Sequence, residues 1–90
     1  MDIVEACKTV HRWAELLAAN APGGADPGNV PEAVAEVKRY LEREKADGKP
    51  IRELEIEEHL LTTREAARWV MPFVLSAESM EASKRRKAMS

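Results

Sequence analysis

Residues 61–70 read Leu-Thr-Thr-Arg-Glu-Ala-Ala-Arg-Trp-Val and contain the start of an amphipathic helix. Thr62 and Glu65 have the spacing of a capping box, so the helix is expected to begin at Thr62 or Thr63. The apolar residues that follow recur at helical spacing: Ala66, Val70 and Phe73, flanked by Trp69. Such a helix must bury its apolar side against other elements of the chain.

Pro72 lies inside this apolar segment. A proline removes one helix hydrogen bond and clashes with the preceding turn, which costs about 3 kcal/mol in a helix interior. We therefore expect a kink or break near Pro72, after which Ser76 caps a last helix running toward Ala88. Phe73 and Val74 are expected to anchor the segment to the first helix of the chain.

Two further helices are predicted upstream. Residues 2–20 carry apolar side chains at helical spacing: Ile3, Cys7, Val10, Ala14 and Leu17, widened by Ala6, Trp13 and Leu16. A second stripe begins near Asn29: Val30, Val34, Val37 and Leu41, with Ala33 and Tyr40 beside it. Glycine and proline make residues 21–28 a loop, and residues 47–50 a helix stop. Residues 51–61 fit a short helix better than a strand, although a strand-like piece stays open.

Length and composition set the class of protein. The chain has 90 residues, of which 44% are apolar and 33% charged, as expected of a globular domain. Its single cysteine excludes an intrachain disulfide, and neither a signal peptide nor a membrane-spanning run is visible. We expect a soluble cytoplasmic protein with an all-α fold, a compact bundle of three to four helices. Residues 1–75 would form the helical core, and residues 76–90 a polar, basic C-terminal helix or tail of the same domain.

Five residues at the start of the third helix also match a known pattern: Leu61, Thr62, Glu65, Ala66 and Ala67. This stretch resembles the opening helix of helix-turn-helix modules of the excisionase and MerR-like kind. The resemblance implies a second helix that enters the major groove of DNA. It supports an alternative function, a small DNA-binding regulator that uses residues 62–87.

The four residues Lys84, Arg85, Arg86 and Lys87 form a basic cluster near the C-terminus. Such clusters suit nucleic-acid phosphates or an acidic partner, but they also occur as solvated helix ends. A third interpretation pairs the cluster with Glu53, Glu55, Glu57 and Glu58, within one chain or between two subunits.

Catalytic and metal chemistry find little support in the sequence. Cys7 and His11 are four residues apart on one predicted helix, but a zinc site needs three or four ligands. Cys7 also lies on the apolar stripe, where a free cysteine is usually inert. The acidic stretch before residue 60 is typical of a solvated face. We therefore predict no metal, no cofactor and no catalytic residues.

A protein-binding role is the function that these features favour. Two tryptophans and the run Met-Pro-Phe-Val-Leu at residues 71–75 give a short chain apolar surface to spare. The predicted partner-binding residues are Trp69, Met71 and Phe73, with Arg64 and Arg68 beside them. The expected protein is an adaptor, regulator or inhibitor that binds a protein partner or a second copy of itself, as a homo-oligomer or a subunit of a complex.

Overall fold

The computed structural model describes residues 1–19, 29–44 and 51–89 of the chain. The described residues form three α-helices and two short 3-10 helices and contain no strand: α1 (Ile3–Ala18), α2 (Val30–Glu44), η1 (Arg52–Leu54), η2 (Glu58–Thr62) and α3 (Arg64–Met89). The predicted all-α bundle is therefore confirmed. The expected loop at residues 21–28 and helix stop at residues 47–50 lie outside the described residues.

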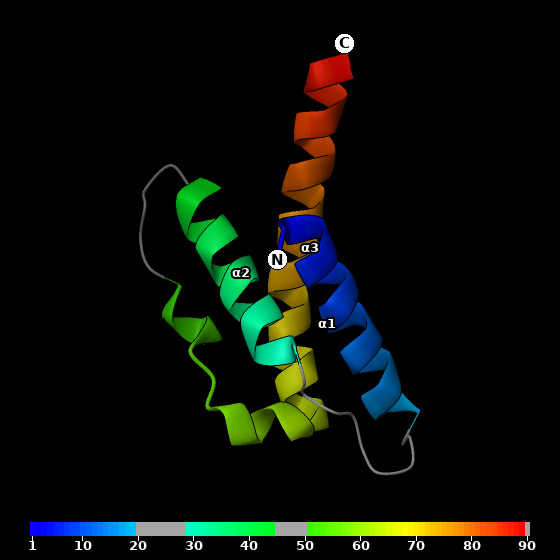
Figure 1. Ribbon diagram of the computed structural model, residues 1–90, viewed down its shortest axis with the longest axis vertical. Helices are drawn as coiled ribbons and strands as arrows, with labels where there is room; N and C mark the ends of the chain where they lie inside the picture. The colour runs from blue at the N-terminus through cyan, green and yellow to red at the C-terminus, as the bar shows by residue number, and fades with distance from the viewer. Residues whose placement is uncertain (20–28, 45–50, 90) are drawn as a thin grey trace.

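Helix α3 runs the length of the molecule, and α1 and α2 pack on two sides of it (Figure 1). The C-terminal end of α1 lies beside the start of α3, because Arg64 Nε donates a hydrogen bond to the carbonyl of Leu17. Helix α1 is thus antiparallel to α3. Helix α2 runs parallel to α3, since its later residue Tyr40 donates to Glu81 at 3.0 Å. The C-terminal turns of α3 extend beyond both neighbours (Figure 1).

Side-chain caps begin two of the helices. Asp2 accepts a hydrogen bond from the backbone amide of Glu5 at 2.8 Å and so caps α1. At the start of α3, the hydroxyl of Thr63 accepts a hydrogen bond from the amide of Ala66 at 3.2 Å. Thr63 is therefore the residue that caps α3, while Thr62 is the last residue of η2.

Of the predicted kink or break at Pro72, the break does not occur, because α3 continues as one helix of 26 residues, and a kink stays a prediction. Pro72 is exposed to solvent, so water can solvate the carbonyl four residues earlier that lacks a helix donor. On the opposite side of the helix Val70, Val74 and Ala77 are fully buried. Burial of residues before and after Pro72 in the sequence stabilises the continuous helix and outweighs the preference of proline for a helix break.

The continuity of α3 corrects two further predictions. Ser76 is an exposed residue inside α3 and does not cap a separate C-terminal helix, so the helix crosses the expected boundary between residues 75 and 76. A helix-turn-helix module needs a turn and a second helix after its opening helix. The helix that begins at Arg64 has no such turn before Met89, so these residues do not form the module that the resemblance implies.

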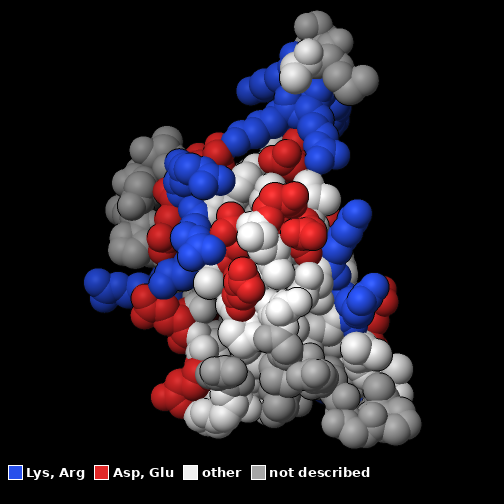
Figure 2. All heavy atoms as spheres, in the orientation of Figure 1, with Lys and Arg blue, Asp and Glu red and all other residues white. Residues whose placement is uncertain are grey.

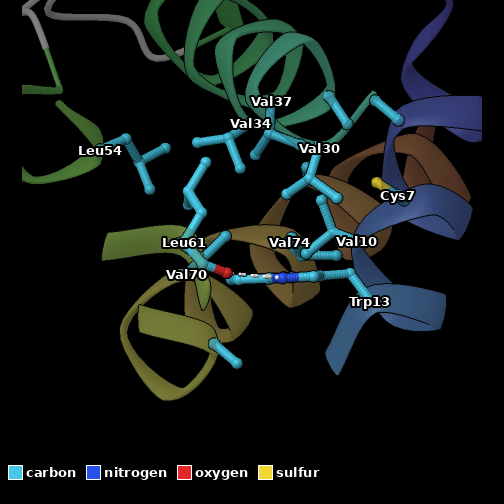
Figure 3. Packing of buried hydrophobic residues seen from close by; sticks show 14 of the residues in the cluster. Cys7, Val10, Trp13, Val30, Val34, Val37, Leu54, Leu61, Val70 and Val74 are labelled. Atoms are coloured by element: carbon cyan, nitrogen blue, oxygen red, sulfur yellow. Dashed lines mark hydrogen bonds between the residues drawn. The ribbon is translucent and has the colours of Figure 1, made fainter. Parts of the chain in front are cut away.

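A single apolar core joins the three helices and the two 3-10 helices. Its largest fully buried side chains are Trp13, Tyr40, Leu41, Leu61, Val10, Val37, Val70 and Val74. The indole of Trp13 points from α1 across the core, and its N–H donates a hydrogen bond of 2.8 Å to the carbonyl of Leu61 (Figure 3). The core is thus tied to the segment that leads into α3.

Residues 51–61, whose structure the sequence left open, contain η1 and the first four residues of η2 and no strand. Ile51, Leu54 and Leu61 are buried, so these short helices cover the core beside α2. The amide of Ile51 donates a hydrogen bond to the Glu42 carboxylate at 2.9 Å. This segment therefore covers one side of the bundle and leads into α3 at Thr63.

Candidate functional site

An open groove of about 500 Å³ runs between α1 and α3, and we call it the α1/α3 groove. It is lined by Ala14, Leu17 and Ala18 of α1, and by Arg64, Ala67, Arg68, Met71, Pro72 and Leu75 of α3. The residues from α3 are spaced three or four apart or adjacent to such positions, which places them on one face of the helix. The groove is therefore formed by one face of each helix.

The floor of the α1/α3 groove is buried, whereas its rim exposes a large apolar side chain. Leu17 and Ala67 are each only 7% exposed, and Met71 is half-buried. Leu75 is 55% exposed, which is unusual for a leucine next to a packed core. The groove thus offers apolar surface that a partner can cover.

Two arginines give the groove a positive rim. Arg64 Nε donates to the carbonyl of Leu17 at 3.2 Å, where the last carbonyls of α1 need partners. This contact closes the groove at the α1 C-terminus. Arg68 is exposed, and within the described part of the chain it forms no ion pair. Of the described residues, no acidic one lines the groove, so these residues give it a positive electrostatic character.

The predicted partner-binding residues do not lie on one surface. Arg64, Arg68 and Met71 line the α1/α3 groove. Trp69 lies about 160° around α3 from Met71, because successive helix residues are about 100° apart. Its indole N–H donates to the carbonyl of Glu53 in η1 at 2.6 Å, and its side chain is 56% exposed. Phe73 shares the flank of Trp69 and is half-buried against the core.

A smaller cavity of about 230 Å³ lies further along the seam between α1 and α3. Cys7 and His11 of α1 face Glu78 and Glu81 of α3 there, and His11 Nε2 lies 2.5 Å from Glu78 Oε1. The Cys7 thiol is 5% exposed, as its place on the apolar stripe predicts. Burial, together with the two carboxylates, raises the thiol pKa from 9.0 to about 11. Cys7 is therefore protonated at neutral pH and a poor nucleophile.

The raised pKa of Cys7 predicts a loss of stability in alkali. The unfolded thiol loses its proton near pH 9.0 and the folded thiol near pH 11, so stability falls as pH rises through this window. We expect the free energy of unfolding to fall by up to about 2 kcal/mol. Urea unfolding of wild type and Cys7→Ala between pH 8 and pH 11 measures the effect as a difference in slope. Parallel pH profiles would contradict it.

Among the described residues, no three His, Cys, Asp or Glu side chains are grouped so that they could hold a metal ion. The lining of the α1/α3 groove contributed by residues 1–19, 29–44 and 51–89 has no hydroxyl, thiol, imidazole or carboxyl group. The groove is suited to binding apolar surface rather than to acid–base or nucleophilic chemistry.

The basic cluster lies at the projecting end of α3, where Lys and Arg side chains gather around the helix (Figure 2). Lys84 Nζ is 2.5 Å from Glu44 Oε1 and 5.2 Å from the centre of the Tyr40 ring. This ion pair raises the pKa of Lys84 and lowers the pKa of Glu44. Arg85 Nε lies 3.7 Å from Glu81.

These contacts differ from the predicted intrachain pairing of the basic cluster with the acidic stretch. Lys84 and Arg85 pair with acids of α2 and α3. In the acidic stretch, Glu55 instead accepts from Lys38 at 2.7 Å. The Lys84–Glu44 pair could not be predicted from the sequence, because it depends on the parallel packing of α2 and α3, whereas Arg85 and Glu81 are four residues apart within α3. Contact of the basic cluster with a nucleic acid or an acidic partner stays a prediction.

None of the helices in the described residues combines the length and the apolar character needed to cross a bilayer. A scan against protein-family models finds no match, and searches of curated proteins and of solved structures find no significant match either.

Proposed function

We propose that this chain is a small protein–protein interaction module that binds a partner protein through the α1/α3 groove and has no catalytic role. The observation that carries the proposal is the open apolar groove with Leu75 55% exposed at its rim. Exposed apolar surface of this kind commonly marks an interface. Grooves between two helices are a recurring mode of peptide recognition.

The contacts of the basic cluster make a DNA-binding role the weaker alternative. Lys84 and Arg85 are engaged by Glu44 and Glu81, whose charges oppose the approach of phosphates. The continuous helix α3 also removes the helix-turn-helix argument. The α1/α3 groove depends on neither feature. Protein binding is therefore the function that the described residues support best.

Replacing Leu75 with glutamine is expected to weaken partner binding about tenfold. Burying a leucine contributes roughly 1.5–3 kcal/mol, and each 1.4 kcal/mol changes an affinity about tenfold. Leu16→Gln is the matched control, because Leu16 is a 39% exposed leucine of α1 that does not line the groove. Immobilised wild type, Leu75→Gln and Leu16→Gln would be exposed to lysate of the source cells, and retained proteins identified and titrated.

The outcomes of this experiment separate the two functions. A protein held by wild type and by Leu16→Gln, but lost by Leu75→Gln, supports binding in the groove. Equal retention by all three chains contradicts it. Immobilised duplex DNA provides the second arm. Salt-sensitive retention on DNA that Arg86→Glu abolishes, with no groove-dependent protein partner, would favour the nucleic-acid alternative.

A further inference from the structure

The shape of the α1/α3 groove selects the backbone conformation of what it can bind. Its two walls are α-helices, whose backbone N–H and C=O groups are paired within each helix except near the ends and at the Arg68 carbonyl, which Pro72 leaves without a helix donor. An extended peptide would find no sheet edge there to satisfy its own backbone. A helix brings its hydrogen bonds with it, so a helical segment is the occupant that the walls accept.

The length of the groove sets the length of that segment. From Arg64 to Leu75 the groove follows about three turns of α3, or roughly 16 Å at 1.5 Å per residue. A partner helix of similar length presents three to four apolar residues at i, i+3 or i+4, and i+7. Leu17, Met71 and Leu75 are the apolar contacts available to them.

The charge of the groove selects the polar residues of the partner. Arg64 and Arg68 line it at one end, and its lining includes no carboxylate from the part of the chain that the structure describes. Toward the other end of the seam lie Glu78 and Glu81, which disfavour acidic groups there. Acidic residues on the partner helix are therefore favoured beside Arg68 and disfavoured near Glu78.

We propose that the α1/α3 groove binds an amphipathic helix of a partner protein, with acidic residues flanking its apolar face at the end next to Arg64 and Arg68. This inference rests on the proposed function and adds the chemistry of the partner to it. The apolar face supplies the burial, and the acidic flank supplies orientation and selectivity against basic helices.

Three synthetic helical peptides test the proposal. They share one leucine face and differ only in flanking residues at one end, which are glutamate, lysine or glutamine. Backbone amide NMR shifts of the full chain locate the site, and titration gives each Kd. We expect shifts at Leu17, Met71 and Leu75, with the glutamate peptide bound at least tenfold more tightly than the lysine peptide. This difference should narrow at high salt.

Charge reversal in the protein provides the matched control. Arg68→Glu, which together with Arg64 leaves no net charge at this end, is expected to abolish the difference between the glutamate and lysine peptides, and Arg68→Gln to reduce it. The Gln variant keeps the test valid if the Glu variant does not fold. Arg12→Glu makes the same charge change at an exposed arginine of α1 that does not line the groove. It should leave the order of the peptides unchanged.

The outcomes distinguish the partner chemistry from the docking function. Groove shifts with equal affinity for all three peptides would overturn the acidic helix and leave the groove as a docking site. Absence of groove shifts with every peptide, together with lysate partners that Leu75→Gln retains, would overturn both. Groove shifts that appear when the protein concentration is raised without peptide, together with a matching rise in mass, would overturn the partner helix. They would assign the groove to a second copy of the chain.

Discussion

Replacing Trp13 with alanine is expected to lower the free energy of unfolding by about 3–5 kcal/mol. The Trp13 side chain is 1% exposed and fills the centre of the core (Figure 3). Its N–H also satisfies the carbonyl of Leu61 at 2.8 Å, and truncation leaves that buried group without its partner. Domains are typically stable by about 5–15 kcal/mol, so the variant should be partly unfolded at 37 °C.

Trp69 offers a control with the same substitution. Its side chain is 56% exposed, so Trp69→Ala should cost less than about 1.5 kcal/mol, including its hydrogen bond to Glu53. Trp13→Phe keeps most of the ring and removes the N–H, which separates the hydrogen bond from the packing. Urea unfolding followed by circular dichroism measures all three variants. Equal losses at Trp13 and Trp69 would show that the core is not organised around Trp13.

Replacing Pro72 with alanine is expected to raise the free energy of unfolding by about 1–3 kcal/mol. Proline in a helix interior is roughly 3 kcal/mol less favourable than alanine, and part of this cost has been relieved by local adjustment. Pro72 is exposed, so its replacement removes little buried surface. The new amide can donate to the carbonyl of Arg68 and complete the hydrogen bonding of α3.

Ser76→Ala serves as the comparison for this gain. Ser76 is exposed in the next turn of α3, and its replacement tests helix propensity without a proline effect. It should raise stability by no more than about 0.5 kcal/mol. Thermal and urea unfolding of the two variants give the comparison. A Pro72→Ala variant that is less stable than wild type would indicate that the proline ring itself supports the packing of α1 on α3.

The helices of this bundle could be predicted because their apolar stripes coincide with the core. Cys7, Val10 and Leu17 of α1 recur at helical spacing and are buried. Val34 and Val37 of α2 have the same spacing and are buried too. The predicted break at Pro72 is wrong because the local cost of proline is outweighed by the tertiary packing of α3 before and after it. The preference of one residue cannot outweigh several buried neighbours, and that burial depends on contacts distant in sequence.

The candidate site could be predicted only in part. Arg64, Arg68 and Met71 were identified and line the groove, and their i, i+4 and i+7 spacing leads on to Leu75, which was missed. Trp69 and Phe73 were grouped with them by proximity in sequence, although a helix separates them onto another flank. The α1 side of the groove, including Leu17, required the antiparallel pairing of α1 and α3, which periodicity does not specify.

The reactivity of Cys7 can report how often α1 separates from the rest of the bundle. It is the only cysteine of the 90 residues, and burial keeps its thiol both covered and protonated. Cys7 lines the cavity in the seam between α1 and α3 but is only 5% exposed, so we expect a maleimide or disulfide reagent to label it much faster when α1 separates from α3. A fluorophore could then be attached selectively to a new surface cysteine, because the native thiol reacts slowly while α1 stays packed on α3.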